Sequence, residues 1–359
     1  MKAAVCYAFG EPLLVEEVTI DPPQAGEVKI RLAATAICHS DVHLIRGEWG
    51  GKLPVVAGHE AAGVVEAVGE HVTLAKPGDS VVVSLLRSCG RCFYCTTGLP
   101  HMCDGAFALE TERRLHNGRG EALLQGISTA AFAEYTVVDQ SQIVPIPADM
   151  PLDRAALLAC GVITGLGAVV NTARVRPGQS VAVIGIGGVG LNAIQGAVLA
   201  GAHPIVAVDR LATKLTAAQS FGATHTINAA DQDPVAALKE LTGGHGVDYT
   251  VVTVGNPTAV AQGIDMIRPT GTAVIVGLPH KGATVALSVG DLVLNERKVI
   301  GCLMGSTRLR VDVPQLVALY QHGRLKLDEL ITNRYPLERI NEAITAMETG
   351  EALRNVIIF

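Results

Sequence analysis

The sequence predicts an α/β protein with two parts, a six-stranded doubly wound parallel sheet and a second domain rich in β-strands. The chain has 359 residues, more than one hydrophobic core usually serves. Hydrophobic residues make up 49% of the chain and aromatic residues only 4%, and there are 39 glycines. This composition is typical of buried parallel strands joined by tight turns. The sequence pattern also changes near Ser180, which indicates two kinds of architecture.

Short alternating strands punctuated by glycine and proline fill the chain from Met1 to about Cys160. Glu27 to Leu32 and Gly63 to Val68 are examples, and the pattern predicts a β-rich domain. The final segment, Glu351 to Phe359, ends as an apolar strand that we expect to return to this domain. We therefore assign residues 1–161 and 304–359 to the β-rich domain.

Apolar runs alternate with helical stretches between residues 162 and 303, as in Thr213 to Phe221 and Pro234 to Leu241. Such alternation predicts βαβ units and a parallel sheet. Six strands are expected, the number in a full dinucleotide-binding sheet. They are Val181 to Ile184, Ile205 to Val208, Thr224 to Ile227, Tyr249 to Val252, Ala273 to Val276 and Lys298 to Leu303.

The charge pattern favours a small-molecule partner. Net charge is −6 and no long basic run occurs, so neither a nucleic acid nor an anionic membrane is expected to bind. Met1 to Gly10 lacks the pattern of a signal peptide. We also expect no stretch approaching the roughly 20 apolar residues of a membrane span. These features predict a cytoplasmic protein.

Four closely spaced cysteines follow the pattern C-x2-C-x2-C-x7-C, with Gly90 and Gly98 among them. Two intervening residues let a tight turn direct successive sulfurs at one point, and glycine permits that turn. Zinc takes four thiolates in this way, which leaves no open position and predicts a structural zinc. A labile redox cluster or an iron–sulfur centre is the alternative. The four ligands are Cys89, Cys92, Cys95 and Cys103.

A glycine motif, Gly185-Ile-Gly-Gly-Val-Gly190, stands between a predicted strand and an apolar stretch from Leu191 to Ala200. In this context the motif predicts a Rossmann domain whose helix N-terminus meets a pyrophosphate. The next strand ends in Asp209, where a carboxylate can bond the ribose hydroxyls and repel the extra phosphate of NADP. The motif therefore predicts NAD, although Arg210 could hold that phosphate. The alternative is a glycine-rich turn without a ligand.

A second metal site is suggested by two further cysteines and a histidine beside glycines or acidic residues: Cys38, His59 and Cys160. Two thiolates and one imidazole leave the fourth position of zinc open for water or substrate. Each residue also has a simpler reading. Cys160 lies in an apolar segment, where cysteine often acts as a small buried hydrophobic residue. His59 could be a hydrogen-bonded histidine of the core.

Several of these motifs together resemble the zinc-dependent medium-chain alcohol dehydrogenases, and most closely their liver-type branch. The resemblance rests on Gly58-His-Glu-Ala-Ala-Gly63, the four-cysteine spacing, Cys160-Gly-Val-Ile-Thr164 and the glycine motif. It covers nearly the whole chain and implies a GroES-like catalytic domain beside the NAD-binding domain. It implies two zinc ions, a catalytic one on Cys38, His59 and Cys160 and a structural one. Two cysteines and one histidine are also the ligands known for the catalytic zinc of alcohol dehydrogenase.

The resemblance also implies roles for single residues. Asp41 and Glu60 would orient the zinc ligands, and Ser40 and His43 would relay the hydroxyl proton to solvent. Trp49, Leu85 and Phe107 would line the substrate pocket. The alternatives are that Trp49 and Phe107 are core residues, that Ser40 is a turn residue, and that His43 and Lys214 are solvated residues. The cofactor contacts would be His39, Thr164, Gly185, Gly187, Gly188, Val189, Gly190, Asp209, Arg210, Lys214, Val276 and Arg354.

The implied activity is oxidation of an alcohol to its aldehyde, and the reverse, with hydride transfer to NAD. We expect an apolar or aromatic primary alcohol, because no cluster of polar residues in the pocket segments could pair extra hydroxyls. A nicotinoprotein, which holds NAD through turnover, is one alternative, and a non-catalytic NAD-sensing protein is another. We expect a homodimer, with a homotetramer as the alternative.

Overall fold

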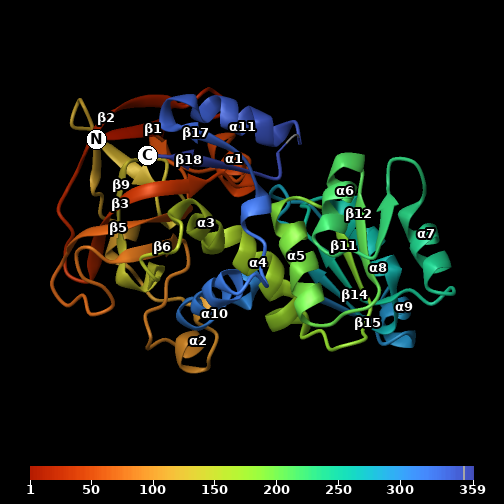
Figure 1. The fold of residues 1–359 in the computed structure, drawn as a ribbon. Coiled ribbons are helices and arrows are strands. Elements are labelled where there is room, and N and C mark those ends of the chain that lie inside the picture. Colours follow the sequence, from red (N-terminus) through yellow and green to blue (C-terminus); the bar gives the residue numbers. More distant parts are fainter. Residues whose placement is uncertain (351) are drawn as a thin grey trace. The chain divides into compact units, whose positions relative to one another are not determined.

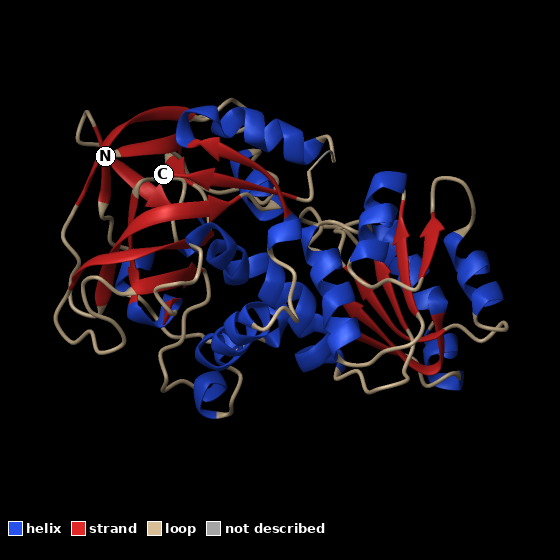
Figure 2. Cartoon of the chain, viewed as in Figure 1, coloured by secondary structure: helices blue, strands red, loops and turns tan. Residues whose placement is uncertain are grey.

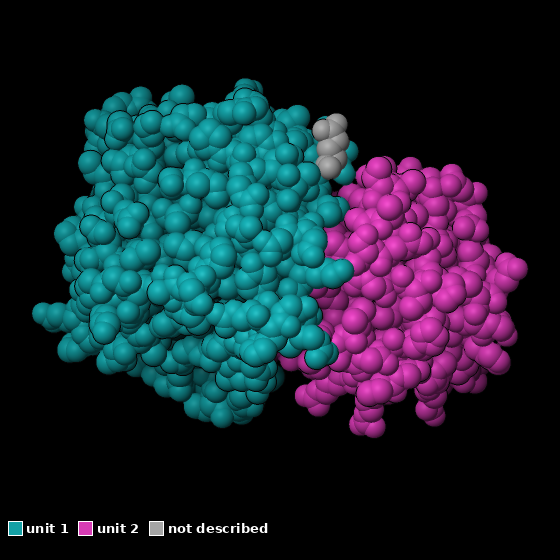
Figure 3. Space-filling view, viewed as in Figure 1, with its two compact units in different colours: residues 1–161, 308–359 teal, residues 162–307 magenta. Residues whose placement is uncertain are grey.

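The computed structural model describes residues 1–350 and 352–359 (Figure 1). The chain divides into two compact units (Figure 3), Met1–Gly161 with Arg308–Phe359, and Val162–Thr307. The second boundary lies after Thr307 rather than after residue 303 because the turn Met304–Ser306 packs on α4 (Ile163–Gly167). Gly305 approaches Gly167 so closely that a Cβ on Gly167 would lie 2.4 Å from the Gly305 carbonyl oxygen.

The first unit is built mainly of strands (Figure 2), as the sequence predicts. Five short strands form a closed barrel in the order β1-β2-β7-β8-β4. A larger sheet has the order β10-β6-β5-β3-β18-β17, and β9 also pairs with β3. The barrel strands are β1 (Lys2–Cys6), β2 (Leu14–Ile20), β4 (Val55–Val56), β7 (Leu115–Asn117) and β8 (Ala122–Gln125). The sheet strands are β3 (Glu27–Ala36), β5 (Glu60–Val68), β6 (Ser80–Ser84), β9 (Tyr135–Asp139), β10 (Ile143–Pro145), β17 (Ile331–Pro336) and β18 (Arg354–Ile358).

The C-terminal strand returns to the first unit, as the sequence predicts. β18 pairs antiparallel with β3 and places Val356 opposite Ala36. Residue 351, the first of the predicted segment, lies outside the described residues. Val28, Ile30 and Leu32 alternate into the core beneath this sheet. The helices of this unit are α1 (His39–Ile45), α2 (Phe93–Thr96), α3 (Leu152–Leu157), α10 (Leu309–Gln321) and α11 (Ile340–Glu348).

The second unit contains the predicted six-stranded parallel sheet. Its order β13-β12-β11-β14-β15-β16 is that of a doubly wound dinucleotide-binding domain, and every pairing is parallel. The strands are β11 (Val181–Ile184), β12 (Ile205–Asp209), β13 (His225–Asn228), β14 (Val247–Val252), β15 (Ile267–Ile275) and β16 (Lys298–Gly301). Besides α4, the helices are α5 (Gly188–Leu199), α6 (Ala212–Ser220), α7 (Pro234–Leu241), α8 (Pro257–Met266) and α9 (Val289–Leu294).

The expectation that no apolar stretch approaches the length of a membrane span is wrong. The helical run Leu152–Ala173 has 22 residues and is long and apolar enough to cross a membrane. Many of its residues are alanine and glycine, so its apolar character is easily missed in the sequence. Within its most apolar window, 83% of the residues are buried inside the protein. A helix that is apolar on all sides and surrounded by protein is a core helix.

Candidate functional site

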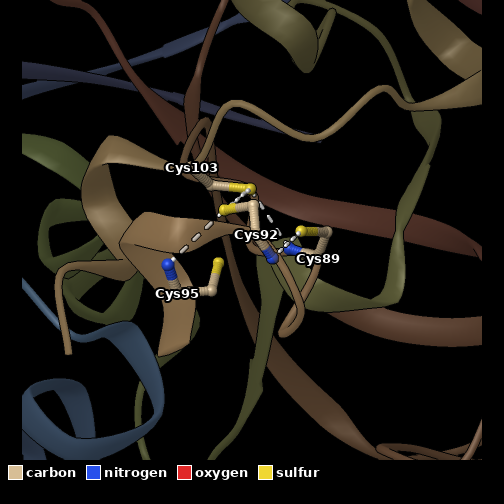
Figure 4. A group of neighbouring side chains, drawn as sticks. All are labelled: Cys89, Cys92, Cys95 and Cys103. Carbon is tan, nitrogen blue, oxygen red and sulfur yellow. Dashed lines mark hydrogen bonds between the residues drawn. The ribbon is translucent and has the colours of Figure 1, made fainter. Parts of the chain in front are cut away.

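The four predicted cysteines converge around α2, with their side chains gathered in one place (Figure 4). Their sulfur atoms all lie within 4.8 Å of one another. Cys92 Sγ and Cys103 Sγ are 3.8 Å apart, too far for a disulfide. A tetrahedron with zinc–sulfur bonds of about 2.3 Å has edges of about 3.8 Å. The spacing of the sulfurs therefore fits a zinc ion held by four thiolates.

Local backbone geometry explains why the cysteines converge. Gly90 and Gly98 have φ values of 73° and 85°, in the left-handed region that the predicted turns require. The amide of Cys92 donates to Cys89 Sγ at 3.3 Å, and the amide of Cys89 donates to Cys103 Sγ at 3.2 Å. Amides of residues 91 and 92 lower the pKa of Cys89 to about 6, whereas burial raises the pKa of Cys95 to about 12. Neighbouring thiols cannot all ionise without a cation, which a zinc ion would supply.

A second cluster gathers ligands from distant segments of the first unit. Cys38 precedes α1, His59 precedes β5, Glu60 begins β5, and Cys160 lies in a π-helical turn that follows α3. One ligand atom from each residue lies within 4.8 Å of the others. The structure thus brings together the three ligands expected for a catalytic zinc, and Glu60 with them.

Asp41 organises this second cluster. Its Oδ1 accepts hydrogen bonds from the Gly58 amide and from His59 Nδ1, both at 2.9 Å. Its Oδ2 accepts from the Cys38 amide at 3.1 Å. Because Nδ1 of His59 is used in this way, Nε2 is the nitrogen left to bind a metal, and within the described chain it is buried without a partner. This orphaned nitrogen beside two thiols is the observation that fits a zinc ion.

Electrostatics couple the members of the cluster. Burial alone would lower the pKa of His59, but Asp41 and then Cys38 outweigh burial and raise it well above its usual value. The Cys160 thiol donates to Cys38, which lowers the pKa of Cys38 and raises that of Cys160. A group of buried acids and bases that shift one another's pKa values in this way is typical of a functional site.

Arg354 lies against Glu60 in this structure. Its Nη2 is 2.5 Å from Glu60 Oε2, and the Arg354 side chain is 6% exposed. Burial raises the pKa of Glu60 to about 7, against the opposing effect of Arg354. Gly161 leaves room for this pair, since a Cβ there would lie 2.4 Å from Arg354 Nη1. The expected contact of Arg354 with a pyrophosphate remains a prediction.

The expected relay residues lie on α1, next to the cluster in the chain. Ser40 and His43 are three residues apart and therefore share a face of the helix. His43 Nδ1 lies 2.5 Å from Glu48 Oε2, and its ring lies 5.1 Å from the Trp49 ring. The sequence prediction missed Glu48, because residues five apart are not a helical pair and only the turn after α1 brings them together.

The expected pocket residues lie in different surroundings. Trp49 stands beside His43, and Leu85 follows β6 and is half-buried. Phe107 lies 5.3 Å from the Arg87 guanidinium. It lines a hollow of about 430 Å³ together with Cys89 of the four-cysteine loop. Trp49 is therefore the pocket candidate that the structure places beside His43, one of the expected relay residues.

The glycine motif of the second unit forms the strand, turn and helix that the sequence predicts. Gly185 has a φ of 88°, and a Cβ on Gly190 would lie 1.9 Å from the Gly185 carbonyl oxygen. Gly187 stands directly before α5, and nothing lies within 4 Å of where its Cβ would be. Asp209 Oδ2 accepts from the Ile186 amide at 2.6 Å, so this carboxylate also holds the turn.

The other expected cofactor residues occupy both units. Thr164 Oγ1 donates to Met304 Sδ at 3.6 Å, and Val276 follows β15. Lys214 is half-buried on α6, and Arg210 is exposed at the end of β12. His39, the exposed first residue of α1, belongs to the first unit. Their contacts with a dinucleotide remain predictions.

A six-stranded parallel sheet with a glycine-rich turn, joined to a β-rich unit with two clusters that fit zinc, defines a zinc-dependent dehydrogenase. A family model for the zinc-binding dehydrogenase matches residues 188–322, and one for the alcohol dehydrogenase GroES-like domain matches residues 24–148. The chain belongs to the zinc-dependent medium-chain alcohol dehydrogenase family.

Similar proteins cover the whole chain. The NDMA-dependent alcohol dehydrogenase of Amycolatopsis methanolica is 42% identical over 99% of this chain and 98% of its own. The crystal structure of benzyl alcohol dehydrogenase from Acinetobacter calcoaceticus superposes with a TM-score of 0.94, at 34% identity over 100% and 99% of the two chains. A zinc-binding dehydrogenase from Sinorhizobium meliloti, solved bound to NADP, has a TM-score of 0.85 at 28% identity over 100% and 99%.

The protein is therefore an oxidoreductase, a zinc-dependent alcohol dehydrogenase. The comparisons define the family and not the branch within it. The complete ligand set of Cys38, His59 and Cys160 also argues against a non-catalytic sensor, because a sensor has no chemical need for a metal site with an open position.

Proposed function

We propose that the enzyme interconverts an apolar or aromatic primary alcohol and its aldehyde with hydride transfer to NAD. The observation that carries the proposal is the buried cluster of Cys38, His59 and Cys160, in which His59 Nε2 lacks a partner within the described chain. The indole of Trp49 beside the relay residue His43 supports an apolar pocket wall. The similarity to a benzyl alcohol dehydrogenase supports the substrate class.

Zinc held by Cys38, His59 and Cys160 would act as a Lewis acid that lowers the pKa of an alcohol hydroxyl. Asp41 fixes the ring of His59, so that Nε2 faces the two thiols. The pair of Glu60 and Arg354 balances charge beside them. The chain thus supplies two negative ligands and one neutral ligand on a preorganised scaffold.

Proton release falls to α1 in this proposal. Bound NAD would supply the hydride acceptor, so the hydroxyl proton would have to leave the site separately. Ser40 and His43 share one face of the helix, and the side chain of His43 is 28% exposed, so it can pass the proton to solvent. The alcohol would thus lose a hydride to the cofactor and a proton, through His43, to water.

A screen of alcohols tests the substrate class. Primary aliphatic, secondary, benzylic and terpenoid alcohols and sorbitol would each be supplied with NAD while nicotinamide absorbance is followed. We expect the highest kcat/KM for apolar or benzylic primary alcohols. A higher value for sorbitol would refute the proposed pocket and leave the zinc chemistry intact.

A nicotinoprotein is the second candidate, and the name of the NDMA-dependent relative favours it. In such an enzyme NAD stays bound and a second substrate recycles it. Gel filtration of the purified enzyme, followed by denaturation and measurement of released nicotinamide, separates the two candidates. Stoichiometric bound NAD with no turnover of added NAD would favour the nicotinoprotein. Purified enzyme without bound NAD that turns over added NAD would favour the leading proposal.

We further infer that the first unit is the catalytic domain and the second the NAD-binding domain of a cytoplasmic homodimer. A surface on the second unit supports the dimer. β16 is an edge strand of the parallel sheet, and within the described chain only β15 pairs with it. The neighbouring α9 exposes Val289, Val293 and Leu294 at 72%, 69% and 86%. An open strand edge beside exposed apolar side chains suits pairing with a second copy.

A further inference from the structure

A tight reversal after α1 brings Glu48 back to His43. The Glu48 amide donates to the His43 carbonyl and the Gly47 amide to the Leu44 carbonyl, each at 3.0 Å. This pattern is a Schellman motif, and Gly47 has the left-handed φ of 72° that the motif requires. The Glu48 carboxylate then lies 2.5 Å from His43 Nδ1. The backbone itself therefore sets this side-chain pair.

The Glu48 carboxylate determines which nitrogen of His43 can accept a proton. A carboxylate only accepts hydrogen bonds, so His43 Nδ1 carries the hydrogen in this pair. The neutral imidazole then has its lone pair on Nε2. The Trp49 ring restricts the position of the His43 ring from another side. The two ring centroids are 5.1 Å apart, and the interplanar angle is 32°. The ring is thereby held in one tautomer and one orientation.

We propose that Glu48 is the positioning residue of the proton relay, which holds His43 with Nε2 as the accepting atom. The proposal rests on the proposed function, in which His43 passes the hydroxyl proton to solvent. The proton from the alcohol hydroxyl binds His43 Nε2, and water then removes one proton from the ring, while the hydride goes to the nicotinamide. Glu48 accepts a hydrogen bond throughout and forms no covalent bond.

Glu48 acts on His43 more directly than the other charged groups near this histidine. Arg46, at the end of the same helix, is paired with Glu348 of α11. The 3₁₀ turn Gly126–Ser128, which packs against α1, carries no charged side chain. His39 and the buried Asp41 lie on the first turn of α1, where Asp41 is bonded to His59. His43 and Glu48 are 28% and 38% exposed, so their pairing contributes orientation more than folding stability.

The test is the kinetic profile of Glu48→Gln, that is, kcat and KM for alcohol oxidation. We expect a loss of about three- to tenfold at neutral pH, since general acid–base catalysis depends on basicity and orientation. The loss should appear in kcat rather than in KM, because proton transfer and not alcohol binding depends on the orientation of His43. Glu48→Asp should recover part of the rate. Glu348→Gln, which breaks the neighbouring ion pair, is the matched control and should keep the wild-type profile.

A double variant separates this proposal from the function on which it rests. In a His43→Gln background, Glu48→Gln should cause no further loss. If His43→Gln is slow but Glu48→Gln has a wild-type profile, the role of Glu48 is wrong and the relay stands. If His43→Gln is itself as fast as wild type, both the relay and the role of Glu48 are wrong. A loss in Glu48→Gln that persists in the His43→Gln background would indicate a merely structural role and also overturn the proposal.

Discussion

Asp209 has two tasks that the sequence shows only in part. Its predicted task is to favour NAD by meeting ribose hydroxyls and repelling a phosphate. In the structure its two oxygens also accept hydrogen bonds from the amides of Ile186 and Leu211, at 2.6 and 3.0 Å. The same carboxylate therefore holds the glycine-rich turn in shape and places a negative charge beside it.

We predict that the enzyme prefers NAD over NADP by at least about tenfold in kcat/KM, or about 1.4 kcal/mol. Asp209→Gly should narrow or invert this ratio, because Arg210 is then free to meet the extra phosphate. It should also weaken NAD binding, since the Ile186 amide loses its acceptor. Steady-state kinetics with both cofactors measure the ratio. Equal values in the unmutated enzyme would refute the role of Asp209.

We propose that the Trp49 side chain limits the size of the alcohol that the enzyme accepts. Trp49→Ala should raise kcat/KM for bulky alcohols relative to ethanol, because each methylene accommodated in an apolar pocket is worth about 1 to 3 kcal/mol. Its indole packs beside His43, so absolute rates should also fall. The measurement is the kcat/KM ratio of a benzylic alcohol to ethanol in both proteins. An unchanged ratio would remove Trp49 from the pocket wall.

At the scale of elements, one ion pair secures the start of β14. Asp248 accepts from the amide and hydroxyl of Ser180 at 2.8 and 2.6 Å, and from Arg268 Nη2 at 2.6 Å. Burial would raise the pKa of Asp248, but the bonds from Ser180 and Arg268 prevail and hold it below the usual value of 3.8. A carboxyl with a lowered folded-state pKa stabilises the fold above its unfolded pKa and loses this effect as pH falls through the folded pKa.

We therefore predict that Asp248→Asn destabilises β11 and β14 by about 1 to 3 kcal/mol at pH 7. The difference from wild type should shrink as the pH falls below about 4. Hydrogen exchange of the amides in these strands measures the effect, with both proteins compared at each pH. Asp265→Asn, at an exposed position on α8, is the control and should change nothing. A destabilisation independent of pH would show that charge is not the cause.

The six strands of the second unit could be predicted from the sequence, because most contain an apolar run, such as Val181–Ile184 and Ile205–Asp209, that alternates with helical stretches. The four-cysteine cluster was equally accessible, since its ligands are close in sequence. The second cluster needed the family resemblance, because Cys38, His59 and Cys160 meet only through tertiary folding. Asp41 is hydrogen-bonded to His59, as the resemblance implies. The pairs His43–Glu48 and Glu60–Arg354 could not be predicted, since they depend on a reversal and on a returning strand.

At the scale of the whole molecule, the proposed dimer would form at the edge of the second unit. We predict a dimer by analytical ultracentrifugation, and a monomer after Leu294→Lys, because a charge would have to be buried in the interface. Leu294 is 86% exposed in the single chain, so the substitution should not harm its folding. Leu14→Lys, at a position 54% exposed on the first unit, should remain a dimer. A variant at Leu294 that stays dimeric would place the interface elsewhere.

The central claim is that the two cysteine-containing clusters bind two zinc ions with different roles. Elemental analysis combined with activity tests it most directly, on the unmutated enzyme, Cys160→Ala and Cys95→Ala, with the buried Cys6→Ala as control. We predict two zinc ions per chain in the unmutated enzyme and in the control. Cys160→Ala should fold but lose the activity, whereas Cys95→Ala should lose folding stability, because a structural zinc contributes to the free energy of folding. One zinc ion per chain with full activity in the unmutated enzyme would contradict this account.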